Sequence, residues 1–240
     1  MNLRHNLNHL LRRCGWNISR FSPSSHPLAK RKWLIQKYEI DTMLDVGANV
    51  GQYARQARMD LGYRNKIISF EPLKEAFSIL QDQSKFDPLW ECHNFALGDK
   101  TEVATINVSA NSYSSSILSM LPKHLHAAPD SRYIESEEIP VKTMDSIFTD
   151  LHIESHHIWL KIDTQGFEKR VLSGAERSLA KIDTVQIEMS LVPLYLGEGS
   201  FPEMLSLMAK NGYSLIALEN GFHDKDSGQL LQVDGIFHRI

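Results

Sequence analysis

The 240-residue sequence has only two cysteines, Cys14 and Cys92, and its longest apolar runs are a handful of residues. A disulfide scaffold and a bilayer-spanning helix, which needs about 20 apolar residues, are therefore both excluded. The N-terminus is basic but lacks the apolar segment and the cleavage site of a secretory signal. These absences predict a soluble protein of the cytoplasm.

Acidic residues are missing from the first 38 positions, although the whole chain has a formal charge of −3. Eight of the 26 basic residues lie in that segment, so 18 basic residues remain against all 29 acidic ones, a net charge of −11. Leu3, Leu7, Leu10 and Leu11 recur at helical spacing. Residues 1–38 are thus predicted to form a basic arm that contains an amphipathic helix.

The arm has two interpretations. We expect its leucines to pack against the acidic body, and the alternative is peripheral contact with an anionic membrane surface, such as the inner face of the membrane. Nucleic acid is not an expected partner, because an acidic body repels phosphates. A homodimer is left open by the sequence.

Short apolar runs alternate with helical patterns through residues 39–240, which we take as one domain. Such alternation indicates parallel strands joined by right-handed crossovers, with helices on both faces of the sheet. Only a Gly/Asp-rich loop joins the last two runs, so the final strand is predicted to be antiparallel. The predicted fold is α/β with a seven-stranded, mostly parallel sheet, and its strands are expected at 42–46, 66–70, 90–95, 158–162, 184–189, 213–218 and 233–238.

The alternation breaks at residues 98–150. Runs at 101–108 and 139–142 predict an inserted side hairpin, which brackets the Ser-rich stretch NSYSSSIL at 111–118. A long polar insertion in a compact domain is typically functional or mobile, and we interpret this one as a lid or substrate loop. Asn111, Ser112 and Ser115 are its candidate substrate-binding residues, although short polar side chains are also ordinary in exposed loops.

The stretch DVGANVGQY, residues 45–53, follows the first predicted strand and opens a helix. Its glycines allow a tight turn in which free N–H groups at a helix N-terminus face a carboxylate or phosphate. Glu71, in KIISFEP, lies about 20 residues further on, where an acid reaches the hydroxyls of a ribose. A turn without a ligand and a Glu71 that only caps the next helix are the structural alternatives. The candidate cofactor-binding residues are Asp45, Gly47, Ala48, Asn49, Gly51, Glu71, Pro72, Asn94 and Ala96.

A second polar group lies at two later strands. Lys161 and Asp163 share one face of a central predicted strand, and Glu188 lies near the end of the next, so both carboxylates are expected at the edge where α/β sheets bind ligands. Asp163 is the candidate general base or acceptor-orienting group, and Glu188 assists it through a hydrogen bond or like charge. His223, in the last loop, is a reserve base. The alternative is a buried network of Lys161 and carboxylates that only fixes the strands.

The segments DVGANVGQY, SFEP, ALGD, VKTMDSIF and LKIDTQGFEKRVLSGA together resemble the FkbM-type methyltransferase family over residues 40–239. The resemblance implies a class I Rossmann-like methyltransferase fold, S-adenosylmethionine as methyl donor, and hydroxyl groups of sugars or natural products as acceptors. Many family members carry Glu where this chain has Gln165. That departure removes an acid from the site, so a divalent cation on Asp163 and Glu188, with Glu168 as third ligand, is not favoured and no metal site is assigned.

The sequence therefore predicts an S-adenosylmethionine-dependent O-methyltransferase that acts on a hydroxyl of a sugar, glycan or glycolipid-like small molecule. Lys161 and Gln165 are further candidates for the substrate side. The alternatives are O-methylation of a polyketide or lipid, and a methyltransferase fold that binds a partner without catalysis. Nicotinamide-dependent oxidoreduction is disfavoured, because Asn49 replaces the second glycine of G-x-G-x-x-G.

Overall fold

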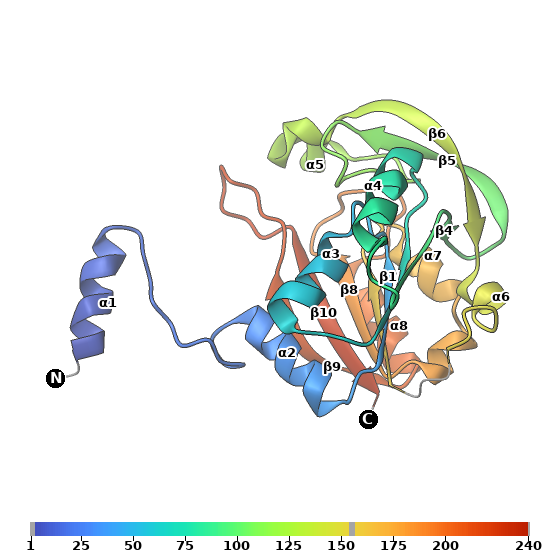
Figure 1. The fold of residues 1–240 in the computed structure, drawn as a ribbon. Helices are drawn as coiled ribbons and strands as arrows, with labels where there is room; N and C mark the ends of the chain where they lie inside the picture. The colour runs from blue at the N-terminus through green and yellow to red at the C-terminus, as the bar shows by residue number, and fades with distance from the viewer. Residues whose placement is uncertain (1–2, 154–156, 240) are drawn as a thin grey trace.

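The computed structural model describes residues 3–153 and 157–239, and its centre is a seven-stranded sheet (Figure 1). The strand order is β3-β2-β1-β7-β8-β10-β9. Neighbours from β3 to β8 are parallel, whereas β10 is antiparallel to both β8 and β9, as predicted. The strands are β1 (Thr42–Val46), β2 (Lys66–Phe70), β3 (Trp90–His93), β7 (Ile158–Ile162), β8 (Thr184–Ser190), β9 (Tyr213–Asn220) and β10 (Gln232–Arg239).

Helices cover both faces of the sheet (Figure 1). One face packs against α2 (Pro27–Lys37), α3 (Gln52–Gln56), the π-helical turn η1 (Ala57–Leu61) and part of α4 (Lys74–Ser84). The other packs against α6 (Met144–Ile147), α7 (Glu168–Ser173), the 3-10 turn η3 (Ser178–Lys181) and α8 (Phe201–Lys210). In the described part of the chain, no helix has both the length and the apolar character needed to cross a membrane.

The inserted segment forms a second, three-stranded sheet of order β4-β6-β5. It consists of β4 (Ala96–Leu97), β5 (Glu102–Ser109) and β6 (Tyr133–Lys142), so the side hairpin is present but its second strand begins well before the predicted position 139. The Ser-rich loop, α5 (Pro122–Ala127) and the 3-10 turn η2 (Pro129–Ser131) lie between β5 and β6. An isolated bridge between Met120 and Tyr195 ties this loop to the body.

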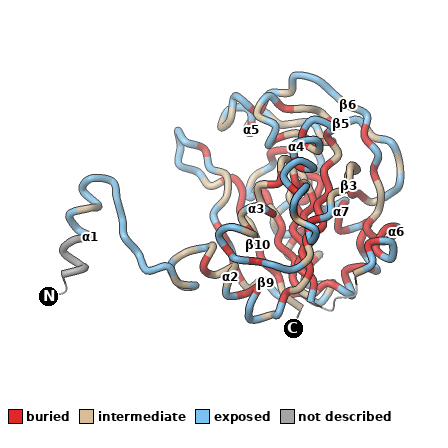
Figure 2. The backbone as a smooth tube through the Cα atoms, in the orientation of Figure 1, coloured by how far each residue is buried: buried red, intermediate tan, exposed pale blue. Residues whose placement is uncertain are grey.

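The arm differs from its prediction. Helix α1 (Leu3–Arg13) lies apart from the body, and the chain that follows it is exposed up to α2 (Figures 1 and 2). Leu10 is exposed, and no described hydrophobic cluster includes a residue before Leu28, which contradicts the predicted packing of Leu10 and Leu11 on the body. The side chains of Leu3 and Leu7 lie outside the described residues.

Helix α2 belongs to the body, although its residues fall within the segment predicted as arm. Leu34 and Ile35 are buried in the cluster that covers one face of the sheet. The guanidinium of Arg31 forms a buried ion pair with Glu219 of β9. Because α2 contacts the sheet in this way, the packed domain begins near residue 27.

Candidate active site

The turn between β1 and α3 is shaped by glycine at Gly47. Its φ is +76°, and a Cβ there would lie 1.9 Å from the backbone oxygen of Asp163. No side chain fits at that distance, so glycine is what lets the ends of β1 and β7 meet. Asn49 is also left-handed, with φ +49°, a conformation that asparagine tolerates.

Four N–H groups of this turn, those of Gly47, Ala48, Asn49 and Gly51, are already hydrogen-bonded within the protein, whereas the sequence predicts free N–H groups here. Gly47 and Ala48 both donate to the carbonyl oxygen of Phe70, at 3.1 and 3.0 Å, and Gly51 donates to Ala48 at 2.9 Å. The N–H of Asn49 donates to Glu71 Oε2 at 2.8 Å. These bonds arise because β1 and β2 are parallel neighbours whose carboxyl ends meet, and they fix the turn without any ligand.

Glu71 is buried at the end of β2, and its contacts are those of the structural alternative, because it holds the glycine turn and the start of the next helix. Its Oε2 accepts from Asn49, and its Oε1 accepts from the N–H of Leu73 at the start of α4, at 2.9 Å. Burial raises the pKa of Glu71 to about 7. A carboxylate offers about four acceptor positions, so each oxygen can accept one more hydrogen bond.

A cavity of about 590 Å³, which is partly open to solvent, extends from Glu71 to Asp163. Its apolar part includes Phe70, Leu73, Ala96, Leu97 and Phe167, and its polar part includes Gly47, Asn49, Ser112 and Ser115. Pro72 and Gln165 also line it, whereas Asp45 and Asn94 do not. The amide of Asn94 instead donates to the carbonyl oxygens of Glu71 and Pro72, at 2.9 and 3.0 Å, and holds the loop after β2.

A buried ion network underlies the turn. The ammonium of Lys161 lies 3.1 Å from Asp45 Oδ1, 3.5 Å from Asp163 Oδ2 and 3.2 Å from the carbonyl oxygen of Gly47. Burial lowers the pKa of Lys161, but the two carboxylates outweigh burial and raise it above its ordinary value. Burial also raises the pKa of Asp45. The structural alternative therefore holds for Lys161 and Asp45, which join β1 to β7.

Gln165 joins the two predicted catalytic carboxylates. Its amide nitrogen donates to Asp163 Oδ1 at 2.8 Å and to Glu188 Oε2 at 2.7 Å, and its amide oxygen accepts from the hydroxyl of Tyr195 at 2.8 Å. Gln232 donates to the same Glu188 oxygen at 2.8 Å. Burial and then the charge of Asp163 raise the pKa of Glu188 well above its ordinary value. The predicted pair is thus present, but an amide lies between its members.

Glu168 is turned inward and organises the turn that carries Gln165. Its Oε1 accepts from the N–H of Thr164 at 2.7 Å, from the hydroxyl of Thr164 at 3.1 Å and from the N–H of Gly166 at 3.2 Å. Burial raises the pKa of Glu168 to about 7. These contacts explain why Glu168 does not reach Asp163 and Glu188 as the third ligand of a cation.

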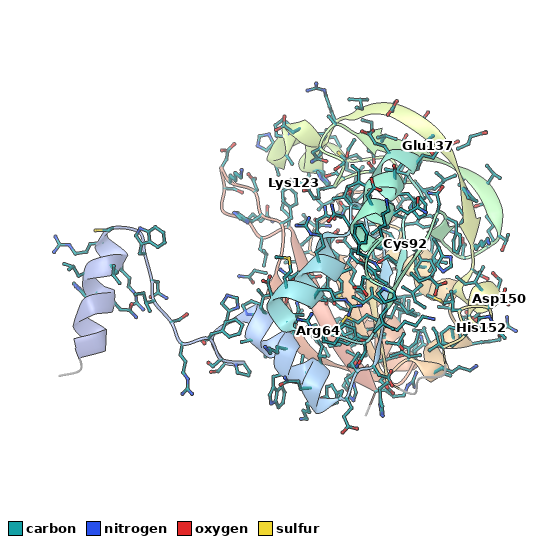
Figure 3. The ribbon with its side chains drawn as sticks, in the orientation of Figure 1. Arg64, Cys92, Lys123, Glu137, Asp150 and His152 are labelled. Carbon is teal, nitrogen blue, oxygen red and sulfur yellow. The ribbon has the colours of Figure 1, made fainter. Side chains whose placement is uncertain are left out.

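Metal-ligand geometry occurs elsewhere in the described residues, at His126, Asp224 and Asp226. The carboxylate of Asp224 already pairs with Lys123, which extends from α5 near the loop between β9 and β10 (Figure 3). A neighbouring ammonium opposes a cation at that place.

A second cavity, enclosing about 780 Å³, opens on the other side of the glycine turn. Gly47, Asn49, Tyr113 and Asp163 line both cavities. The remaining lining residues come from α2, the glycine turn, α3 and the sheet, and are Arg31, Ala48, Gln52, Tyr53, Gln56, Lys161, Gln186 and Asp234. Of these, only Ala48 and Lys161 were predicted.

Hydrogen bonds connect the polar wall of the second cavity. The hydroxyl of Tyr53 donates to Gln186 Oε1 at 3.0 Å, and the amide nitrogen of Gln186 donates to Asp234 Oδ1 at 3.2 Å. Burial raises the pKa of both Tyr53 and Asp234. The sequence contained one signal of this second cavity. Gln186 is a polar residue in the mostly apolar strand VQIEMS, and it lies on the same face as Glu188.

The Ser-rich loop lies over the junction of the two cavities. Asn49 donates through its amide to the carbonyl oxygen of Ser112 at 3.1 Å, and the hydroxyl of Ser116 donates to the carbonyl oxygen of Gln165 at 2.6 Å. Ser112 and Ser115 line the first cavity, and Tyr113 lines both. The predicted lid thus contacts the site from above.

Asn111 and His223 lie away from both cavities, and Asp45, Gly51, Asn94 and Glu188 also line neither of them. Asn111 is directed into its own loop, where its amide donates to the hydroxyls of Ser114 and Ser131 at 3.2 and 3.0 Å. His223 is exposed in the loop between β9 and β10, where its backbone bridges to Leu230. Neither residue is among those that line the two cavities, so the structure places both outside the site.

Comparison with known proteins identifies the family. A model of the methyltransferase FkbM domain matches residues 45–215, which include the glycine turn, Glu71, Asp163 and Glu188. This chain belongs to the FkbM methyltransferase family. The family and the strand order confirm the predicted α/β class I methyltransferase fold, and membership implies S-adenosylmethionine as the methyl donor.

Several solved structures are similar to this FkbM-family chain. An FkbM methyltransferase from Methylobacillus flagellatus has 16% identity and a TM-score of 0.48, over 82% of this chain and 44% of that one. The methyltransferase domain of METTL16 has 9% identity and a TM-score of 0.48, over 99% and 79%. TehB from Haemophilus influenzae has 9% identity and a TM-score of 0.46, over 86% and 60%.

The chain thus spans less than half the length of the Methylobacillus protein. A search of curated proteins found no match. At these identities the similarities concern the fold alone.

Proposed function

We propose that this FkbM-family protein is an O-methyltransferase that transfers the methyl group of S-adenosylmethionine to a hydroxyl of a sugar, glycan or glycolipid-like small molecule. The observation that carries the proposal is the position of Asp163. Its side chain is 35% exposed at the end of β7, and it lines both cavities. One cavity suits the donor and the other the acceptor, and Asp163 is the carboxylate they share.

The first cavity has the chemistry that the donor requires. S-adenosylmethionine supplies a methyl group on a positively charged sulfur. The apolar part, with Phe70, Leu73 and Phe167, suits a flat base, and Glu71 has unused acceptor positions for ribose hydroxyls. Asp163, at the other end of the cavity, is a carboxylate whose charge favours a positively charged group.

The second cavity has the chemistry of a polyhydroxylated acceptor. Side-chain amides of Gln52, Gln56 and Gln186 both donate and accept hydrogen bonds, which matches hydroxyl groups that do the same. The carboxylates of Asp163 and Asp234 line the same space as the cations of Arg31 and Lys161, so the lining has no net charge and suits a neutral acceptor. The cavity therefore supports a neutral sugar-like ring over a polyketide or lipid.

Methyl transfer to oxygen needs little more from the protein than alignment and removal of one proton. Asp163 is the residue to accept that proton from the acceptor hydroxyl. Lys161, at 3.5 Å, and the amide of Gln165, at 2.8 Å, orient its carboxylate. Glu188 lines neither cavity, so its role is to position Gln165 and, through it, Asp163.

Calorimetry followed by methyl transfer tests the proposal. We expect S-adenosylhomocysteine to bind and NAD not to bind, and tritium to pass from S-adenosylmethionine to neutral sugars. Asp163→Ala should keep the affinity for S-adenosylhomocysteine and lose about 10²- to 10⁴-fold in rate, the usual contribution of a general base. Asp130→Ala, an exposed acid outside both cavities, is the matched control.

The other outcomes separate the alternatives. Binding of NAD instead would indicate an oxidoreductase, and binding of S-adenosylhomocysteine with no transfer to any hydroxyl compound would indicate a binding module. Transfer only to apolar acceptors would favour a polyketide or lipid. Unchanged turnover of Asp163→Ala would remove Asp163 from the chemistry.

A further inference from the structure

The segment that precedes α2 has a local structure of its own. Helix α1 is followed by Gly15, whose φ is +81°, and the N–H groups of Cys14 and Trp16 both donate to the carbonyl oxygen of Leu11, at 2.9 Å each. The chain then turns back, and Ile18 exchanges two hydrogen bonds with the side chain of Asn8, at 2.6 and 2.9 Å. We call residues 8–21 the hook.

Large apolar side chains of the hook are open to solvent. Leu10 is 62% exposed, Trp16 72%, Ile18 52% and Phe21 57%. Figure 3 shows that this segment and its side chains lie apart from the body. Burial of a large apolar side chain is favourable by about 1.5–3 kcal/mol. Four exposed apolar side chains within 12 positions therefore indicate a surface that a binding partner or a membrane covers.

The charge of the hook has a single sign. Arg12, Arg13 and Arg20 are exposed, and the sequence has no acidic residue before Glu39. Among the ion pairs of the described residues, none involves these three arginines. The acidic body does not take them up, because the hook lies apart from it (Figure 1).

We infer that the hook docks this protein on an anionic phospholipid surface. Trp16, Ile18 and Phe21 insert at the boundary between headgroups and acyl chains, where such apolar side chains are buried favourably. The arginines form ion pairs with the lipid phosphates. A nucleic acid would use the positive charge but would leave the apolar side chains in water. A second copy of the chain would cover the apolar side chains but would place arginine against arginine.

Docking would also place part of the protein near the lipid surface, because α2 follows the hook after a linker of residues 22–26. Arg31 of α2 lines the second cavity, so the hook holds that side of the protein near the lipid surface. The docking itself does not depend on the proposed function, because it needs neither donor nor acceptor.

Vesicle sedimentation with the full chain tests the inference. Two vesicle types are compared, phosphatidylcholine alone and a mixture in which phosphatidylglycerol replaces about a third of it. The wild type is expected to sediment with the mixture and to stay in solution with phosphatidylcholine. Raising NaCl from about 0.1 to 0.5 M should weaken the binding, because salt screens the lipid charge.

Variants assign the binding to the hook. Each arginine near such a surface contributes about fivefold, so Arg12→Gln/Arg13→Gln/Arg20→Gln should weaken partitioning by about 100-fold. Trp16→Ser/Phe21→Ser should weaken it at unchanged charge. The matched control removes three exposed charges from the body, in Lys85→Gln/Lys210→Gln/Lys225→Gln, and should bind as the wild type does.

Each of three results would overturn the inference. They are failure of the wild type to bind the mixed vesicles, equal binding to both vesicle types, and hook variants that bind like the wild type. A lipid-independent dimer that Trp16→Ser/Phe21→Ser dissociates would assign the hook to a second copy instead. Tight binding to single-stranded RNA that Trp16→Ser/Phe21→Ser leaves intact would assign it to nucleic acid. None of these results alters the calorimetric test of donor binding.

Discussion

Changing Gln165 to Glu tests how the two site carboxylates are held together. The substitution keeps the shape of the side chain and replaces one NH₂ group by oxygen. In the wild type that NH₂ donates to Asp163 at 2.8 Å and to Glu188 at 2.7 Å. In Gln165→Glu both hydrogen bonds are lost, and a third carboxylate faces two others.

The size of the effect follows from those two bonds. A hydrogen bond to a charged group contributes about 1.5–3 kcal/mol, so the loss of two lowers the free energy of unfolding by about 3–6 kcal/mol when all three groups are ionised. This is a large share of the 5–15 kcal/mol typical of a folded domain. At low pH the cost is smaller, because the introduced carboxyl group, once protonated, donates one hydrogen bond.

The pH dependence has a defined sign. Neighbouring carboxylates raise the pKa of the new Glu in the folded state above its unfolded value. A raised carboxyl pKa means that the folded state holds the proton more tightly, so stability is present at low pH and is lost as pH rises through the folded pKa. Gln165→Glu is therefore expected to lose less stability relative to the wild type near pH 5 than near pH 8.5.

Urea unfolding of both proteins at the two pH values measures the effect. Gln81→Glu, on the exposed surface of α4, is the control and should change stability by less than about 0.5 kcal/mol. If Gln165→Glu were as stable as the wild type near pH 8.5, the amide would not bridge the carboxylates. Three carboxylates also suit Mg²⁺, which should restore stability to Gln165→Glu and leave the wild type unchanged.

Three further predictions concern the turn, the donor cavity and α2. Since Glu71 has a pKa of about 7 and can accept hydrogen bonds from both ribose hydroxyls only when ionised, affinity for S-adenosylhomocysteine measured by calorimetry should rise about tenfold from pH 6 to pH 8. A flat profile in the wild type would contradict the proposed role of Glu71. Gly47→Ala should lower the melting point far more than Gly228→Ala, because both require a positive φ but only Gly47 has a backbone oxygen where the Cβ would be, and equal losses would mean that β1 and β7 do not meet so closely. Arg31→Ala leaves the buried carboxylate of Glu219 without its ion-pair partner and should lower the free energy of unfolding in urea by about 3–5 kcal/mol. The double variant Arg31→Ala/Glu219→Ala should recover much of that loss. If the losses of the two single variants simply added in the double variant, the two residues would not be coupled.

Much of the architecture was readable from the sequence. Alternating apolar runs are a local property, so the seven strands and their crossovers followed from periodicity, and the antiparallel final strand followed from a short loop. Spacing placed Glu71 beside the glycine turn, and strand alternation placed Asp163 and Glu188 at one edge of the sheet. The extent of β6 and the split of one predicted helix into α3 and η1 were missed, because neighbouring elements set such boundaries.

Only the tertiary structure decided how the site's polar groups are used. The N–H groups of Gly47 and Ala48 are engaged by Phe70 because two strands align in register, and register is a property of the pair of strands. Gln165 bridges two carboxylates because a left-handed turn, held by Glu168, directs its amide between them. The second cavity joins Arg31, from the segment predicted as a basic arm outside the domain, with Asp234 of the last strand. Contacts between residues so far apart along the chain form only when the helices and strands pack, so periodicity and spacing could not reveal them.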